Sequence, residues 1–175
     1  MTVLRPQRPG IPLPQPTPLS QPFWDGCAAG QLRYQRCEVC GAAEVDPMWV
    51  CRRCGADSLA WQVSAGRGEV YSHTVVWRPQ TPAFTAPYVV VIVQFDEGFT
   101  LLTNLIGCTV EDVRTGLRVS VTFHDVGGGI SLPYVQPRIG PDLDVSHVND
   151  GVDRVRVSHA SDCALSSPPS ARIRR

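Results

Sequence analysis

Four cysteines offer the clearest chemistry in this sequence. They form two Cys-x-x-Cys-Gly pairs separated by ten residues: Cys37, Cys40, Cys51 and Cys54. Two intervening residues let one tight turn direct both sulfurs the same way, and the glycine relieves the backbone of that turn. Four thiolates fill a tetrahedral shell and leave no position for water or substrate. The spacing therefore predicts a structural zinc ribbon.

Two other interpretations of these cysteines have to be weighed. Iron in an electron-transfer site of the rubredoxin type accepts the same four-sulfur geometry. A pair of disulfides is disfavoured, because the N-terminal stretch lacks the apolar region of a secretory signal. Cys27, Cys108 and Cys163 are scattered without pairing spacing, which favours a reducing environment. No apolar run approaches the roughly 18 residues of a membrane span, so we expect a cytoplasmic protein.

Length and composition limit the elements that can position these cysteines. With 175 residues, 43% of them hydrophobic, the chain can bury one ordinary core and a small additional module. Sixteen basic residues balance sixteen acidic ones, and all of the basic residues are arginines. Because the chain contains no lysine, catalysis through a lysine Schiff base is excluded.

The N-terminal part predicts an arm followed by a short helix. Residues 1–19 contain six prolines and few large apolar side chains, which predicts a disordered or polyproline arm. Ser20 can then cap a helix that carries Phe23 and Trp24 on one side. So short a helix does not persist alone. The two aromatic rings must rest either on the chain's own ribbon or on a partner protein.

Residues 20–65 are predicted to form the helix and the ribbon. Short strands are expected at residues 31–36, 42–50 and 58–64, around the two cysteine pairs. This module is too small to fold by hydrophobic burial. A bound metal ion must supply its stability, on the order of 10 kcal/mol as in zinc-finger peptides.

Residues 66–137 predict a mostly β domain. Period-2 patterns mark five strands, with one helical turn at 109–113 capped by Thr109 and Asp112. The residues from 88 to 96 are so continuously apolar that a strand covered on both faces is expected. Five short strands with a helical insert before the fourth favour a closed barrel of the OB type. From residue 138 to 175 the pattern dissolves, which predicts a disordered tail. The expected strands span residues 69–78, 88–96, 99–106, 117–126 and 130–135.

An OB-type barrel also suggests binding of single-stranded nucleic acid or of a nucleotide. Residues 20–137 contain eight arginines and eleven acidic residues, a net charge of −3, which disfavours nucleic acid. A coenzyme A moiety is a second candidate ligand. Its adenine ring could stack on aromatic side chains, which could instead simply close the barrel end, and its phosphates could meet arginines. The candidate contacts are Arg67, Trp77, Arg78, Phe84 and Tyr88.

No residue pattern predicts catalysis by this chain. His73 and His124 fall in expected strands, and no motif such as Gly-x-Ser-x-Gly places a nucleophile beside either of them. We therefore expect a protein without catalytic residues of its own.

A series of segments in fixed order resembles a known family. The family consists of acyl-CoA-associated OB-fold proteins with a rubredoxin-like zinc ribbon, catalogued as domain of unknown function 35. The resemblance covers about residues 20–137. Asp46-Pro47 departs from the Pro-Pro pair common in the family before the third cysteine, which affects only the shape of that loop. The matching segments are Pro22-Phe23-Trp24, Gly30-Gln31-Leu32, the two cysteine pairs with Gly41 and Gly55, Pro47, Trp61, Gly66-Arg67-Gly68-Glu69-Val70-Tyr71-Ser72, Thr74 and Asp96-Glu97-Gly98.

The resemblance implies a function as well as a fold. Members of this family accompany thiolase-superfamily enzymes, including lipid-transfer-protein-like aldolases and ketosynthase-like acyltransferases. We therefore expect a non-catalytic accessory subunit that binds such an enzyme, with Phe23 and Trp24 at the contact, and that helps to shape the passage for an acyl-CoA substrate, as in steroid side-chain degradation. A free-standing acyl-CoA binding protein is the alternative, and an OB-fold nucleic-acid binder is the third possibility.

Overall fold

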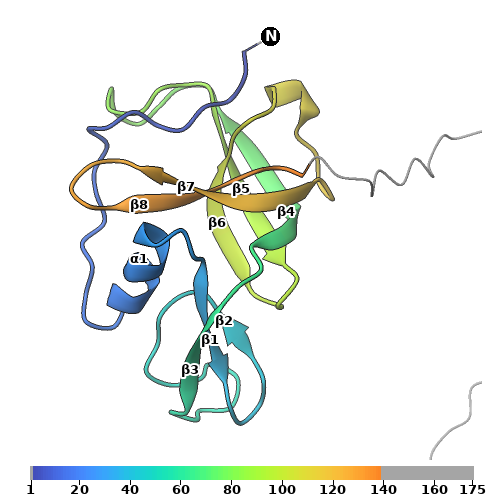
Figure 1. Ribbon diagram of the computed structural model, residues 1–175. Coiled ribbons are helices and arrows are strands. Elements are labelled where there is room, and N and C mark those ends of the chain that lie inside the picture. Colours follow the sequence, from blue (N-terminus) through green and yellow to red (C-terminus); the bar gives the residue numbers. More distant parts are fainter. Residues whose placement is uncertain (1, 139–175) are drawn as a thin grey trace, which may run out of the picture. The chain divides into compact units, whose positions relative to one another are not determined.

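One short helix and eight strands follow one another in residues 2–138, the part of the chain that this computed structural model describes (Figure 1). None of the described helices is long and apolar enough to cross a membrane. Apart from Arg138, the predicted disordered tail of residues 138–175 lies outside the described residues. The elements are α1 (Gln21–Ala28), β1 (Arg33–Cys37), β2 (Ala43–Glu44), β3 (Leu59–Val63), β4 (Arg67–Val76), β5 (Tyr88–Phe95), β6 (Thr100–Leu105), the 3-10 turn η1 (Val110–Asp112), β7 (Arg118–Asp125) and β8 (Ser131–Pro137).

The first three strands form the predicted ribbon. They make an antiparallel sheet in the order β2-β1-β3, so β1 is the central strand. Gln35 on β1 pairs with Glu44 on one side and with Trp61 on the other. Both cysteine pairs lie in turns of this module, since Cys37 ends β1 and Cys51 precedes β3.

The remaining five strands form the predicted closed barrel, in the order β4-β5-β6-β8-β7. All neighbouring pairs are antiparallel except β6 and β8, which run parallel and meet in register only at Leu105 and Val135. The helical turn η1 lies before the fourth barrel strand, as expected. The side chain of Asp112 accepts hydrogen bonds from the amide and the hydroxyl of Thr109, at 3.1 and 2.8 Å.

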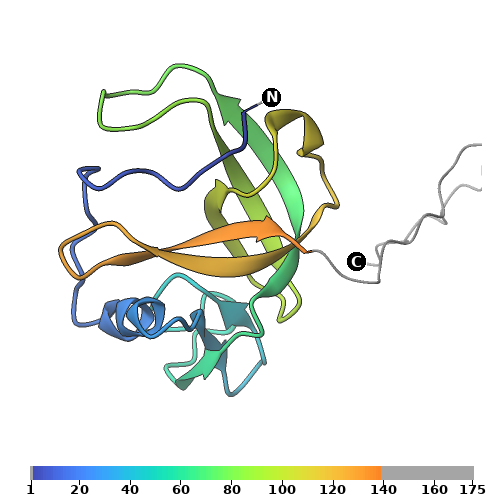
Figure 2. The same ribbon diagram turned by 45° about the horizontal axis from the view of Figure 1, so that its top comes forward.

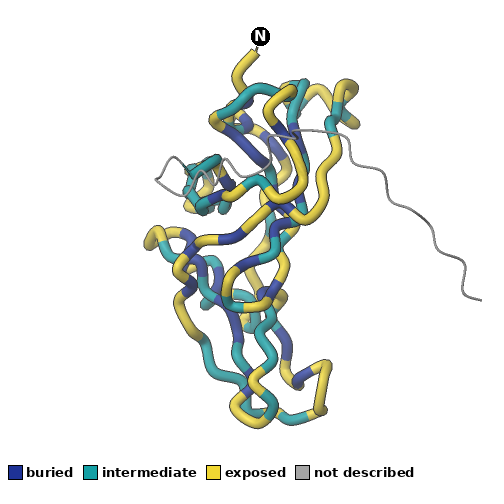
Figure 3. The backbone as a smooth tube through the Cα atoms, turned by 90° about the vertical axis from the view of Figure 1, so that its right-hand side faces the viewer, coloured by how far each residue is buried: buried dark blue, intermediate teal, exposed yellow. Residues whose placement is uncertain are grey.

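Burial along β5 differs from the prediction of a strand covered on both faces. Only alternate residues are buried, namely Val89, Val91, Val93 and Phe95. The residues between them are partly exposed, because no second layer covers the outside of the barrel at this strand. Figure 3 shows buried and exposed segments along the chain. The continuous apolar run thus gives β5 an apolar outer face in addition to its core face.

The ribbon and the barrel share one hydrophobic core. The ring of Tyr34 in β1 stacks on Phe99 at a centroid distance of 5.0 Å, and Phe99 stacks on Phe95 in the barrel at 4.8 Å. Leu32 and Tyr34 are buried in the same cluster as the barrel valines. The position of the ribbon therefore depends on packing against the barrel as well as on the chain connection.

The turn between β5 and β6 also holds the segment that joins ribbon to barrel. The carboxylate of Glu97 accepts hydrogen bonds from the hydroxyl of Ser64 at 2.9 Å and from the amide of Ala65 at 2.6 Å. The guanidinium of Arg36 in the ribbon donates to the backbone carbonyl of Glu97 at 3.3 Å.

Residues 2–19 of the N-terminal arm pack against the barrel, whereas the prediction for residues 1–19 was a disordered or polyproline arm. Leu4 and Ile11 are buried, and Val3 forms a β-bridge with Thr109. Figure 2 shows the arm passing between the β4–β5 loop and the β7–β8 hairpin. The buried side chain of Gln7 makes two hydrogen bonds to the backbone of Thr85 in that loop, at 2.7 and 3.2 Å. Prolines exclude regular structure here, but they do not prevent the intervening apolar residues from packing.

Leu4→Ala should reveal whether the arm contributes to stability. Removing a buried leucine side chain destabilises proteins by about 2–4 kcal/mol, so chemical denaturation should give a correspondingly lower free energy of unfolding. Val3→Ala is the matched control, because Val3 is 49% exposed and its truncation should change stability by less than about 0.5 kcal/mol. Equal, negligible effects of both variants would mean that the arm does not pack in solution.

Candidate functional site

The four predicted cysteine ligands converge at the tip of the ribbon. Their sulfur atoms all lie within 4.8 Å of one another. The Cys37–Cys54 and Cys40–Cys51 sulfurs are each 3.6 Å apart, far beyond the roughly 2.05 Å of a disulfide bond. Sulfurs about 2.3 Å from a tetrahedral Zn²⁺ ion would stand about 3.8 Å apart, so this donor set fits such an ion.

Backbone hydrogen bonds build the two cysteine turns in the same way. The amides of Gly41 and Gly55 donate to the carbonyls of Cys37 and Cys51 at 2.9 and 2.8 Å. Both glycines have positive φ angles, 71° and 76°, which explains why glycine follows each pair. The backbone amide of Cys40 points at the Cys37 sulfur and lowers the pKa of that thiol to about 7, which favours the metal-binding thiolate.

Phe23 and Trp24, the predicted partner contacts, pack partly against other residues of this chain. Phe23 is buried in the shared core, and the Trp24 ring meets it edge-on at a centroid distance of 5.0 Å while remaining partly exposed. Ser20 precedes the helix as predicted, but its hydroxyl bonds to Thr17 instead of capping the helix amides. Intramolecular packing therefore accounts for Phe23, whereas one side of Trp24 stays accessible.

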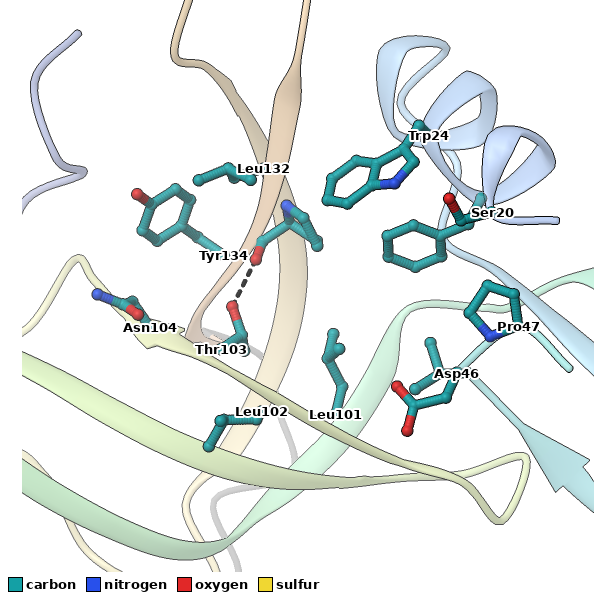
Figure 4. A pocket seen from close by; sticks show the side chains of 13 residues that line it. Ser20, Trp24, Asp46, Pro47, Leu101, Leu102, Thr103, Asn104, Leu132 and Tyr134 are labelled. Carbon is teal, nitrogen blue, oxygen red and sulfur yellow. Dashed lines mark hydrogen bonds between the residues drawn. The ribbon is translucent and has the colours of Figure 1, made fainter. Parts of the chain in front are cut away.

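The accessible side of Trp24 faces a groove (Figure 4). The groove has a volume of about 350 Å³ and lies where β6 and β8 separate. The hydroxyl of Thr103 donates to the carbonyl of Pro133 across this gap, and so replaces a backbone hydrogen bond of the sheet. The walls are Leu101 and Leu102 of β6, Leu132 to Tyr134 of β8, α1, and the ribbon loop around Pro47. This opening in the barrel wall can accept an apolar side chain or chain segment.

The outer face of the barrel next to this groove carries no charge. Outward positions of β5 hold Tyr88, Val90, Ile92 and Gln94, and the facing positions of β6 hold Thr100, Leu102 and Asn104. Leu102 pairs with Ile92 and is 68% exposed, and it also lines the groove. We call this surface the neutral face. Sequence reasoning missed it because it assigned both sides of β5 to the core.

The candidate ligand contacts fall into two separate places. Trp77, Arg78, Phe84 and Tyr88 all flank the loop between β4 and β5, where the Phe84 and Tyr88 rings lie 6.0 Å apart and Trp77 is 64% exposed. Arg67 begins β4, at the opposite end of that strand, and is exposed. A compact ligand cannot touch Arg67 and the loop together.

Neither histidine of the barrel is joined to a nucleophile in the described residues. His73 is exposed on β4, and His124 packs edge-on against Tyr134 at 5.4 Å. Burial lowers the pKa of His124, whose Nε2 atom is buried without a hydrogen-bond partner. Within residues 2–138, no hydrogen bond links these rings to a serine or a cysteine.

Comparison with known proteins gives consistent matches. Residues 61–124 match the family described as the C-terminal OB-fold domain of ChsH2. The chain is 33% identical over 118 residues to a probable enoyl-CoA hydratase alpha subunit of Thermomonospora curvata, covering 67% of this chain and 37% of that protein. It is 34% identical over 103 residues to the 3-oxo-4,17-pregnadiene-20-carboxyl-CoA hydratase alpha subunit of Mycobacterium tuberculosis, covering 59% and 33%. The chain thus matches about a third of the length of these two relatives.

Two further matches cover more of the related chains. A DUF35 domain-containing scaffold protein of Methanocaldococcus jannaschii is 29% identical over 93 residues, which is 52% of this chain and 66% of the relative. A solved structure of the Ltp2-ChsH2(DUF35) aldolase contains a chain that is 30% identical, with a TM-score of 0.66. That match covers 71% of this chain and 98% of the solved one.

Cys51→Ser should remove the metal ion and unfold the ribbon. A metal bound by four thiolates contributes on the order of 10 kcal/mol to such a module, and the shared core should transmit the loss to the barrel. Elemental analysis and thermal melting would measure both effects, and a colourless protein would indicate zinc while a red one would indicate iron. Cys108→Ser is the control, since Cys108 lies outside the cluster. A metal-free protein with an unchanged melting curve would contradict a structural role for the site.

Proposed function

We propose that this chain, which belongs to the DUF35 family of OB-fold proteins, is a non-catalytic accessory subunit of a thiolase-superfamily enzyme that acts on acyl-CoA substrates. The partner would be an aldolase or acyltransferase of the lipid-transfer-protein-like type and would supply the catalytic residues. The solved aldolase that contains a similar chain supports this proposal, as does the scaffold name of the archaeal relative. A steroid-CoA substrate is supported by the name of the mycobacterial relative.

The neutral face is the structural observation on which the proposal rests. The cores of protein interfaces are depleted in charged residues and enriched in apolar side chains. Ile92 and Leu102 pair across β5 and β6, and no acidic or basic side chain stands between them. An exposed apolar sheet face of this kind is typical of a protein-binding surface.

The groove beside the neutral face extends the same surface. Leu102 belongs to both, and Trp24 forms the far wall of the groove. A partner that covers the neutral face would therefore also reach Trp24. Partially exposed tryptophans in pockets are frequent sources of binding energy. In this arrangement the groove would help to shape the passage of the acyl-CoA substrate beside the partner's active site.

The metal centre has a structural role in this proposal. We assign Zn²⁺ to the four cysteines because all ligands are thiolates and zinc sites of this type are closed. The ion would hold β1, where Tyr34 and the preceding residue Leu32 pack in the shared core. Cysteines that bind metal must be reduced, which agrees with a cytoplasmic location.

The first test of the proposal is whether this chain binds the predicted partner enzyme. The full chain, affinity-purified from its native host, should carry a thiolase-fold enzyme in stoichiometric amount, identified by mass spectrometry. The enzyme expressed without this chain should be less stable and less active than the co-expressed pair. An enzyme that is fully active and stable by itself would refute the accessory role.

Leu102→Arg should weaken the binding of this chain to its partner enzyme. An arginine at the centre of an apolar interface is desolvated without a partner, and we expect at least a hundredfold weaker binding, about 3 kcal/mol. Leu102 is largely exposed, so the variant should keep its melting temperature. Val3→Arg is the matched control, because Val3 is 49% exposed and lies outside the neutral face, the groove and the cysteine cluster. Unchanged co-purification of Leu102→Arg would place the contact elsewhere on the chain.

A further inference from the structure

The strand register gathers three arginines on another part of the barrel surface. Arg67 of β4 pairs with Ser120 of β7, which pairs with Gln136 of β8. The next row on the same face begins with Glu69, which pairs with Arg118. Arg138 completes this row, because its amide donates to the Arg118 carbonyl at 3.0 Å. Six side chains from three strands thus form two neighbouring rows.

These six side chains point outward. Their neighbours in sequence, Val70, Val119 and Val135, are fully buried, so alternation along each strand turns the intervening residues to the surface. Arg67, Arg118 and Glu69 are exposed, and Arg138 is partly exposed. We call this surface the arginine face.

Within residues 2–138, no carboxylate forms an ion pair with an arginine of this face. Its six residues include three arginines and one carboxylate, Glu69. Among residues 2–138, the single ion pair within 4.0 Å joins Arg52 and Asp46, in the ribbon. Residues 2–138 contain eleven arginines and eleven acidic residues, so a formal charge of +2 on this one face is a local excess.

The arginine face is also hollowed. A depression of about 400 Å³ is lined by Arg67, Ser120, Gln136 and Arg138, together with Ala65 and Pro137. A second depression of about 480 Å³ adjoins it and shares Ala65 and Ser120. The second depression runs between Gly30–Leu32 and Ser120–Phe123, and its walls are less polar. Together they make a crevice with a cationic end and a neutral extension.

We propose that the arginine face binds the phosphate groups of a small organic ligand, and that the neutral extension receives the rest of that molecule. Guanidinium groups bind phosphate oxygens through paired N–H donors, and the Ser120 hydroxyl and Gln136 amide add further donors. Resting on the proposed function, the source of the phosphates is the coenzyme A part of an acyl-CoA thioester. The proposed phosphate site therefore includes Arg67 and lies away from the candidate ligand contacts of the β4–β5 loop.

The shape and composition of this surface favour a small molecule over a macromolecule. Binding of an acidic protein surface would not require a depression beside the arginines. Single-stranded nucleic acid binds through aromatic side chains that stack on bases next to a basic groove, and neither row contains an aromatic residue. Two depressions of a few hundred Å³ match the size of sites for small ligands.

Calorimetry on the isolated full-length chain tests the assignment. Coenzyme A should bind, inorganic pyrophosphate should compete with it, and affinity should fall as salt rises. The double variant R67Q/R138Q should bind coenzyme A at least tenfold more weakly with an unchanged melting temperature, because both side chains are at the surface. The double variant R53Q/R114Q removes two exposed arginines elsewhere and should bind as the parent does.

Either of two results would overturn the assignment. One is the absence of binding by the parent protein at millimolar coenzyme A in low salt. The other is equal weakening, or none, in the two double variants. Comparison with 3′-dephospho-coenzyme A distinguishes the 3′-phosphate from the diphosphate as the bound group, since only the former is lost. These titrations need no partner enzyme, so coenzyme A binding can be refuted while the accessory role stands. The accessory role can likewise be refuted while coenzyme A binding stands.

Discussion

In the proposed function, one ion held by the four converging cysteines fixes the strand on which the rest of the ribbon depends. Cys37 ends β1, and the same strand carries Tyr34 into the aromatic stack with Phe99 and Phe95. The ribbon has few buried residues of its own, so a bound ion and the shared core would act together to hold β1 in place. Helix α1 packs against this arrangement, and its exposed aromatic side forms one wall of the groove.

The barrel separates two kinds of surface by strand register alone. Antiparallel pairing places uncharged side chains in rows across β5 and β6, and arginines in rows across β4, β7 and β8. The parallel contact between β6 and β8 is limited to one residue pair, which leaves the wall open where Trp24 stands. The two surfaces meet where Gln94 of the neutral face pairs with Glu69 of the arginine face. A protein partner and a charged small molecule can therefore occupy adjoining parts of one small domain.

Local patterns in the sequence were sufficient for the fold but not for its surfaces. The cysteine spacing, the period-2 strands and the Thr109–Asp112 cap depend on residues close in sequence, and all three features appear in the structure. The strand predicted over residues 42–50 is an exception, because it is reduced to β2 (Ala43–Glu44). The packing of Leu4 and Gln7 depends on residues more than 70 positions away, so proline content suggested disorder instead. The arginine face depends on which strands pair and in which register. Five strands allow several orders, and Arg67, Arg118 and Arg138 come together because β7 lies between β4 and β8.

The contact between Glu97 and the joining segment Ser64–Ala65 has a consequence for how this chain can vary in length. Tips of β-hairpins are usually among the places where a protein tolerates inserted residues. Here the tip supplies the carboxylate that holds the joining segment and the carbonyl that receives Arg36 of the ribbon. An insertion between Asp96 and Gly98 would displace both contacts at once and release the ribbon from its fixed angle to the barrel. Length variation among functional forms of this chain should therefore avoid this turn.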